Sequence, residues 1–169
     1  GKWTLASSGV TIDGFYFNNV PPRTIEGSSM NLDNVAIRNC VLLAATGAGN
    51  GTAGNIQFAA GSGKTLHQFT LEQNFIRNPG SGFLYISHTA NNGTIRSNYI
   101  NCRYFGFGPF PVWSGGNLVS KPMGWVIEGN EFDGVIGGVP YKGRGFNAQF
   151  GDLIDRKSTR LNSSHVALS

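Results

Sequence analysis

Three carboxylates gather within six positions of the chain, at Glu128, Glu131 and Asp133. Two carboxylates that flank a glycosidic bond can hydrolyse it, one as the acid and the other as the base or nucleophile. Carboxylate oxygens are also the ligands that Ca²⁺ prefers. Because Glu128 and Glu131 lie on opposite sides of an expected turn at Asn130, the sequence favours solvated turn residues over one shared site. We therefore expect no cofactor, with Ca²⁺ as the alternative.

The other group suited to binding chemistry is aromatic and falls between residues 104 and 113. Five aromatic residues occur in these ten positions, together with Gly and Pro that limit backbone freedom. Aromatic rings suit the apolar C–H faces of sugars. The stretch predicts either a sugar-binding platform or a loop that covers the core. Its candidate binding residues are Tyr104, Phe107, Phe110 and Trp113.

The histidines and cysteines suggest no catalytic or metal site. His67 and His88 have no partner at ligand spacing, which favours exposed or hydrogen-bonded histidines. Cys40 and Cys102 do not form a CxxC motif. We interpret both cysteines as small buried apolar residues.

A repeated six-residue segment must position these side chains. Its first column reads Ile, Ile, Leu, Ile, Ile, and its last column reads Phe, Leu, Ile, Ile, Phe. Stacking such segments about 4.8 Å apart would bury both columns continuously. The segments start 25, 34, 24 and 32 residues apart, and they are residues 12–17, 37–42, 71–76, 95–100 and 127–132. Further strands are expected at residues 55–59, 83–87 and 146–150.

Two other columns of the repeat carry polar side chains. The second column alternates in charge, which predicts an exposed charge row that helps to set the register, with a sugar-binding row as the alternative. The fourth column predicts an asparagine hydrogen-bond ladder from the third segment onward, with Asn also suited to a left-handed turn. The charge row is Asp13, Arg38, Glu72, Arg96 and Glu128, and the ladder is Asn74, Asn98 and Asn130.

The I-x-x-N-x-I/F pattern at this spacing resembles the right-handed parallel β-helix superfamily, over about residues 10–150. That superfamily includes pectate-lyase-like enzymes and tailspike-like phage proteins. The resemblance implies an all-β solenoid of about five coils that is secreted, extracellular or on a cell or virion surface. It also implies a polysaccharide or glycan partner and, by analogy with tailspikes, a homotrimer in the full-length protein.

The resemblance leaves catalysis open. The paired aspartates and Gly-His-Gly of polygalacturonase-like enzymes are absent, as is the core-strand Asp-His of pectate-lyase-like enzymes. An enzyme of this kind would be a polysaccharide lyase or a glycoside hydrolase. The alternative function is a non-catalytic structural or adhesive repeat protein, because one fold serves many functions.

The last residues differ from the rest of the chain. Residues 155–165 resemble the conceptual translation of a sequencing adapter. We therefore expect a partial β-helix domain over residues 1–154 and a non-native tail, disordered or poorly packed, over residues 155–169. Without Asp155, Arg156, Lys157 and Arg160 the formal charge falls from +4 to +2, which argues against a nucleic-acid partner. No apolar run is long enough for a membrane span.

Overall fold

The computed structural model consists of β-strands and connecting turns in the residues that it describes. Only the backbone is described for residue 20 and for the ranges 106–107, 112–114, 117–120, 135–136, 139–140, 153–156 and 159–161. Side chains are described as well for residues 3–19, 24–27, 30–44, 55–58, 64–79, 82–86, 89–102 and 123–133.

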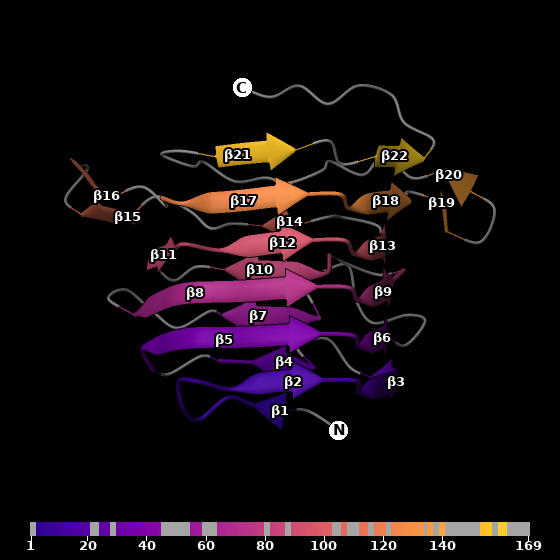
Figure 1. Cartoon of the computed structure of the whole chain (residues 1–169), viewed down its shortest axis with the longest axis horizontal. Coiled ribbons are helices and arrows are strands. Elements are labelled where there is room, and N and C mark those ends of the chain that lie inside the picture. Colours follow the sequence, from indigo (N-terminus) through magenta and orange to yellow (C-terminus); the bar gives the residue numbers. More distant parts are fainter. Residues whose placement is uncertain are drawn as a thin grey trace.

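Three parallel sheets make up the fold, and the chain visits them in turn (Figure 1). Sheet A contains β1 (Trp3–Thr4), β4 (Ile25–Glu26), β7 (Ile56–Phe58), β10 (Leu84–Ile86) and β14 (Gly106–Phe107). Sheet B contains β2 (Thr11–Asp13), β5 (Leu32–Arg38), β8 (Thr65–Glu72), β12 (Thr94–Arg96), β17 (Trp125–Glu128) and β21 (Leu153–Arg156), with β11 (Thr89–Asn91) also paired to β8. Sheet C contains β3 (Tyr16–Val20), β6 (Val41–Ala44), β9 (Phe75–Asn78), β13 (Tyr99–Cys102), β18 (Glu131–Asp133) and β22 (Thr159–Leu161).

Two antiparallel hairpins lie outside these sheets. One joins β15 (Val112–Ser114) to β16 (Asn117–Ser120), and the other joins β19 (Val135–Ile136) to β20 (Val139–Pro140). None of the residues that the structure describes forms a helix that could span a bilayer. The all-β, parallel architecture is therefore confirmed, and it is compatible with a β-solenoid.

The register of the sheets confirms the repeat. Ile12 pairs with Ile37, and the same column continues through Leu71, Ile95 and Ile127 in sheet B. In sheet C, Phe17, Leu42, Ile76, Ile100 and Phe132 are aligned in the same way. Nine of these ten side chains are buried, and the tenth, Phe132, is partly buried and packs against the core. The expected strands near residues 55–59 and 83–87 are β7 and β10, whereas residues 146–150 lie outside the described residues.

The asparagine ladder is also confirmed. Asn98 Nδ2 donates to the Leu71 carbonyl at 2.9 Å and to Asn130 Oδ1 at 2.9 Å, while Asn98 Oδ1 accepts the backbone N–H of Asn74 at 3.0 Å. Asn74 and Asn130 repeat this pattern with the carbonyls of Ile37 and Ile95. Each buried amide thus satisfies the backbone of the preceding segment at the corner between sheets B and C.

At this corner the residue with positive φ is the one directly before each ladder asparagine. The prediction that the ladder asparagines themselves adopt the left-handed conformation is therefore wrong. A ladder side chain must point inward to reach the neighbouring backbone, and the sharp bend falls on the residue before it. A second column with positive φ lies five positions earlier in every segment. The two columns are Gly9, Asn34, Gln68, Asn92 and Gly124, and then Gly14, Asn39, Gln73, Ser97 and Gly129.

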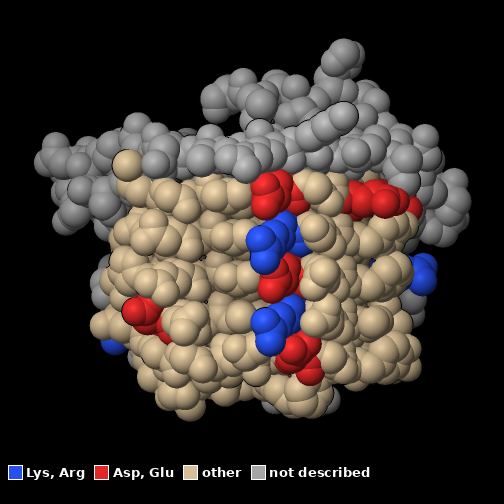
Figure 2. Space-filling model, in the orientation of Figure 1, with Lys and Arg blue, Asp and Glu red and all other residues tan. Residues whose placement is uncertain are grey.

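The charge row lies across the outer face of sheet B, where Figure 2 shows acidic and basic patches in alternation. Arg38 Nε is 3.0 Å from Asp13 Oδ2, and an Arg96 guanidinium nitrogen is 2.6 Å from Glu72 Oε2. A hydrogen bond from Asn39 is the main cause that lowers the pKa of Asp13, followed by its contact with Arg38. Such exposed pairs favour the correct register more than they add stability.

Candidate functional site

The structure separates the three predicted acidic residues. Glu128 ends β17 on sheet B and belongs to the charge row, whereas Glu131 and Asp133 lie on β18 in sheet C. Asn130, which is 1% exposed, occupies the corner between them. Glu131 and Asp133 are two positions apart on one strand and point away from the core, since Phe132 between them packs against it. The three predicted acidic residues therefore do not form one cluster: Glu131 and Asp133 lie together on sheet C, and Glu128 belongs to the charge row on sheet B.

Asp133 is held by two side chains of the neighbouring strand β13. The Tyr99 hydroxyl donates to Asp133 Oδ2 at 2.7 Å, and Asn101 Nδ2 donates to the same oxygen at 3.0 Å. Burial, followed by the hydrogen bond and negative charge of Asp133, raises the pKa of Tyr99 to about 12. This network fixes the carboxylate and extends the pH range over which the phenol stays protonated.

No metal centre is found where side chains are described, because no group of three or more His, Cys, Asp or Glu side chains lies together there. His67 lies on β8 with Asp33 and Asn91 as its neighbours in register, and His88 lies outside the described residues. Cys40 and Cys102 are free and buried, as predicted.

The aromatic loop candidates stay a prediction. Phe107 lies on β14 and Trp113 on β15, and only the backbone is described for both. Tyr104 and Phe110 lie outside the described residues.

A different set of outward side chains lies on β3, β6 and β9 of sheet C and includes the lining of a hollow, and we call this surface the β6 groove. At the first outward position Tyr16 is 64% exposed and Phe75 is 40% exposed, while Val41 between them is more buried. At the next outward position Asn18 and Arg77 are exposed on either side of the half-buried Leu43. The floor is therefore β6, with taller side chains on both neighbouring strands.

One wall of the groove is an aromatic ring that stands upright. Phe75 and Tyr99 are stacked, with ring centroids 4.9 Å apart and planes 10° apart. Their strands pair in register, and adjacent strands lie about 4.8 Å apart. Because Tyr99 covers one face of the Phe75 ring, the opposite face is turned toward β6. Val41 is too small to cover that face.

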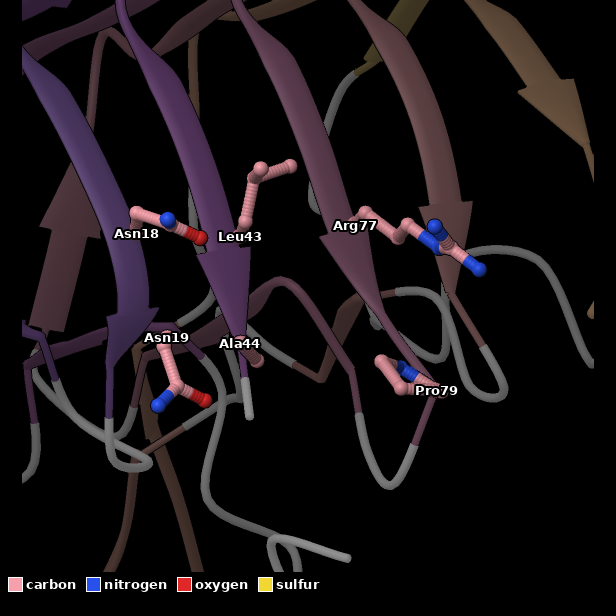
Figure 3. A pocket seen from close by; sticks show the side chains of 6 residues that line it. All are labelled: Asn18, Asn19, Leu43, Ala44, Arg77 and Pro79. Atoms are coloured by element: carbon pink, nitrogen blue, oxygen red, sulfur yellow. The ribbon is translucent and has the colours of Figure 1, made fainter. Parts of the chain in front are cut away.

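The other half of the groove is a hollow of about 210 Å³ that both polar and apolar residues line. Figure 3 shows Asn18, Leu43 and Arg77 side by side on three strands, with the Asn18 amide turned toward Leu43 and the Arg77 guanidinium turned away from it. Arg38 and Arg96 have carboxylate partners, whereas no ion pair is found for Arg77 among the described side chains. The hollow is lined by Asn18, Asn19, Leu43, Ala44, Arg77 and Pro79.

The β6 groove offers the two contacts that sugars require. An apolar ring face suits pyranose C–H groups, while amides and a guanidinium can hydrogen-bond to hydroxyl or carboxylate oxygens. The sequence contained a signal for it, namely the fifth column of the repeat: Tyr16, Val41, Phe75, Tyr99 and Glu131. Strand alternation places this column on the outer face, opposite the buried sixth column.

Comparison of the chain with protein-family models, with curated proteins and with solved structures finds no match.

Proposed function

We propose that the chain is part of a right-handed parallel β-helix of about five coils that binds polysaccharide through the β6 groove. The observation that carries this proposal is the Phe75 ring, which is 40% exposed and stacked on Tyr99, on the strand next to the hollow at Leu43. Right-handedness is what the connection between parallel strands of one sheet almost always adopts. Exposed aromatic groups beside a hollow that polar groups help to line are typical of ligand sites.

The β-helix resemblance and the groove independently support a polysaccharide as the partner. A polysaccharide partner fits a secreted protein or one on a cell or virion surface. The proposal concerns binding, and it assigns a catalytic role to no residue. Asp133 and Glu131 lie on the same sheet as the groove but two strands beyond Phe75, separated from it by β13.

The proposal is tested by retention of the protein on immobilised polysaccharides, both neutral and acidic. Phe75→Ala should lower retention at least tenfold, because it removes the ring face. Phe15→Ala is a matched control, since Phe15 is 44% exposed but lies outside the groove. Equal retention of both variants and of the parent protein would refute the role of the groove.

The aromatic loop provides a second sugar-binding hypothesis within the same function. Trp113→Ala tests it on the same polysaccharides. Loss of retention in this variant, with Phe75→Ala unaffected, would move the site to the loop.

A non-catalytic structural or adhesive solenoid that recognises no polysaccharide in the β6 groove is the second candidate function. The observation that favours it is the regularity of the charge row and the asparagine ladder, both of which serve stacking. This function predicts no retention on any polysaccharide.

A further inference from the structure

The β6 groove has a direction, and that direction constrains the ligand. Its outward floor residues Val41 and Leu43 belong to one strand, and Ala44 at the end of that strand lines the hollow. Its walls are the neighbouring strands β3 and β9. The groove therefore runs along β6, across the direction in which the segments stack.

A polymer that followed the stacking direction would meet obstacles on sheet C. The stacked rings of Phe75 and Tyr99 have their planes nearly parallel to each other, with centroids 4.9 Å apart along that direction. Phe75 is 40% exposed and Tyr16 is 64% exposed, so both rise above Val41. A chain along the stack would have to cross these side chains in succession.

The groove is also short. The four residues of β6 span about 10 Å at about 3.3 Å per residue, which is about the length of two sugar rings. The hollow of about 210 Å³ at one end is smaller than the pockets of roughly 300–1,000 Å³ that hold drug-sized ligands, and it suits one ring.

We infer that the glycan crosses the sheet along β6, so that the site recognises about two sugar units of the chain and not a long stretch laid along the stack. One unit packs against the free face of Phe75 over Val41. The next lies over Leu43, on the side toward which the Asn18 amide is turned and beside the stem of Arg77. This inference rests on the proposed function.

The test is titration calorimetry of the full chain with two probe series, cello-oligosaccharides and oligogalacturonides, each from mono- to hexasaccharide. Affinity should rise from mono- to disaccharide and then change less than threefold up to the hexasaccharide. The parent protein is sufficient for this measurement, so it does not depend on a variant that folds.

Two variants locate the short site. Val41→Phe raises the floor and should lower disaccharide affinity at least tenfold. Leu43→Tyr fills the hollow from the same strand and should have a similar effect. Thr70→Phe adds the same ring on the outer face of sheet B and should leave affinity unchanged, with circular dichroism confirming the fold of all three.

The outcomes separate this inference from the proposed function. Affinity that keeps rising with each added unit to the hexasaccharide, or that is unchanged in both groove-filling variants, overturns the crossing geometry while binding itself stands. Failure of the parent protein to bind any immobilised polysaccharide or oligosaccharide overturns the proposed function and this inference together.

Discussion

At the residue scale, the asparagine ladder replaces backbone hydrogen bonds that the corner between two sheets cannot provide. The sequence predicted its members because one residue type recurred at one column of the repeat. It could not predict which residue takes the left-handed conformation. That position holds Gly, Asn, Gln and Ser, which share no single signature.

Removal of one ladder asparagine should lower the free energy of unfolding. Asn98→Ala would leave the buried Asn74 N–H and Leu71 carbonyl without the partners that Asn98 supplies. Each such loss costs about 1–3 kcal/mol, so for the two groups we expect a fall of about 2–6 kcal/mol in the free energy of unfolding, measured by denaturant titration. Asn18→Ala, at an exposed position, should change it by less than about 0.5 kcal/mol. Equal effects of the two substitutions would contradict the ladder.

The ladder should be extendable by one rung. Cys40 occupies the ladder column, and its Sγ lies 3.7 Å from the Ile12 carbonyl, the position equivalent to the Ile37 carbonyl that Asn74 reaches. Cys40→Asn would place an amide there, and we expect a gain of about 0.5–1.5 kcal/mol in the free energy of unfolding. Cys40→Ala is the matched control. A greater loss of stability in Cys40→Asn than in Cys40→Ala would show that the column does not accept a further amide.

Tyr99 gives a spectroscopic test of the Asp133 network. Its pKa is raised to about 12 by burial and by Asp133, which means that the folded state favours the protonated phenol. The stabilisation is present below the ordinary pKa of 10 and is lost as the pH rises toward 12. Alkaline absorbance titration should show a tyrosine ionising near pH 12 that is missing in Tyr99→Phe. Asp133→Asn should lower that pKa, and an unchanged value would refute the coupling.

At the element scale, neighbouring segments fit together through complementary side-chain size. Gly93 carries no side chain, and the ring of Trp125 on β17 occupies the space beside it. Trp125 Nε1 donates to the Ala90 carbonyl at 3.0 Å, which fixes the ring there. The sequence alone did not reveal this pair, because Gly93 and Trp125 become neighbours only through the register of β12 and β17.

Gly93→Ala should therefore destabilise the protein. A Cβ at this position would overlap the Trp125 ring, and overpacking of this kind costs about 1–3 kcal/mol. The same substitution in a Trp125→Leu background should cost much less, because the ring is gone. A double-mutant cycle of unfolding free energies measures this coupling. Additive effects would contradict the packing.

At the scale of the whole molecule, sheet C illustrates what a sequence can and cannot reveal. The stacking of five segments followed from apolar columns and spacing, and the register confirms it. The β6 groove could not be predicted from the sequence alone, because it depends on which outward side chains become neighbours in the sheet. The register places the small Val41 between Tyr16 and Phe75. The aromatic loop drew attention in the sequence because its residues are close along the chain.

The last two strands depart from the pattern of the core columns. The register pairs Asp155 with Ile127 and Arg160 with Phe132, positions that hold Ile, Leu or Phe in every earlier segment. A charged residue in such a column weakens a stacked segment. Removal of residues 155–169 should therefore leave the melting temperature unchanged or raise it. Removal of residues 123–169, which include β17 and β18, should lower it markedly. A similar loss for both truncations would contradict the expectation of a non-native tail.

The most direct test of the account is an NMR titration of the isotope-labelled protein with a disaccharide that it binds. Chemical-shift changes should concentrate at Val41, Leu43 and Phe75 on sheet C, while Thr70 and Thr94 on the outer face of sheet B stay unchanged. Shift changes confined to residues 104–113 or to the charge row, with none at Val41, Leu43 and Phe75, would contradict binding in the β6 groove.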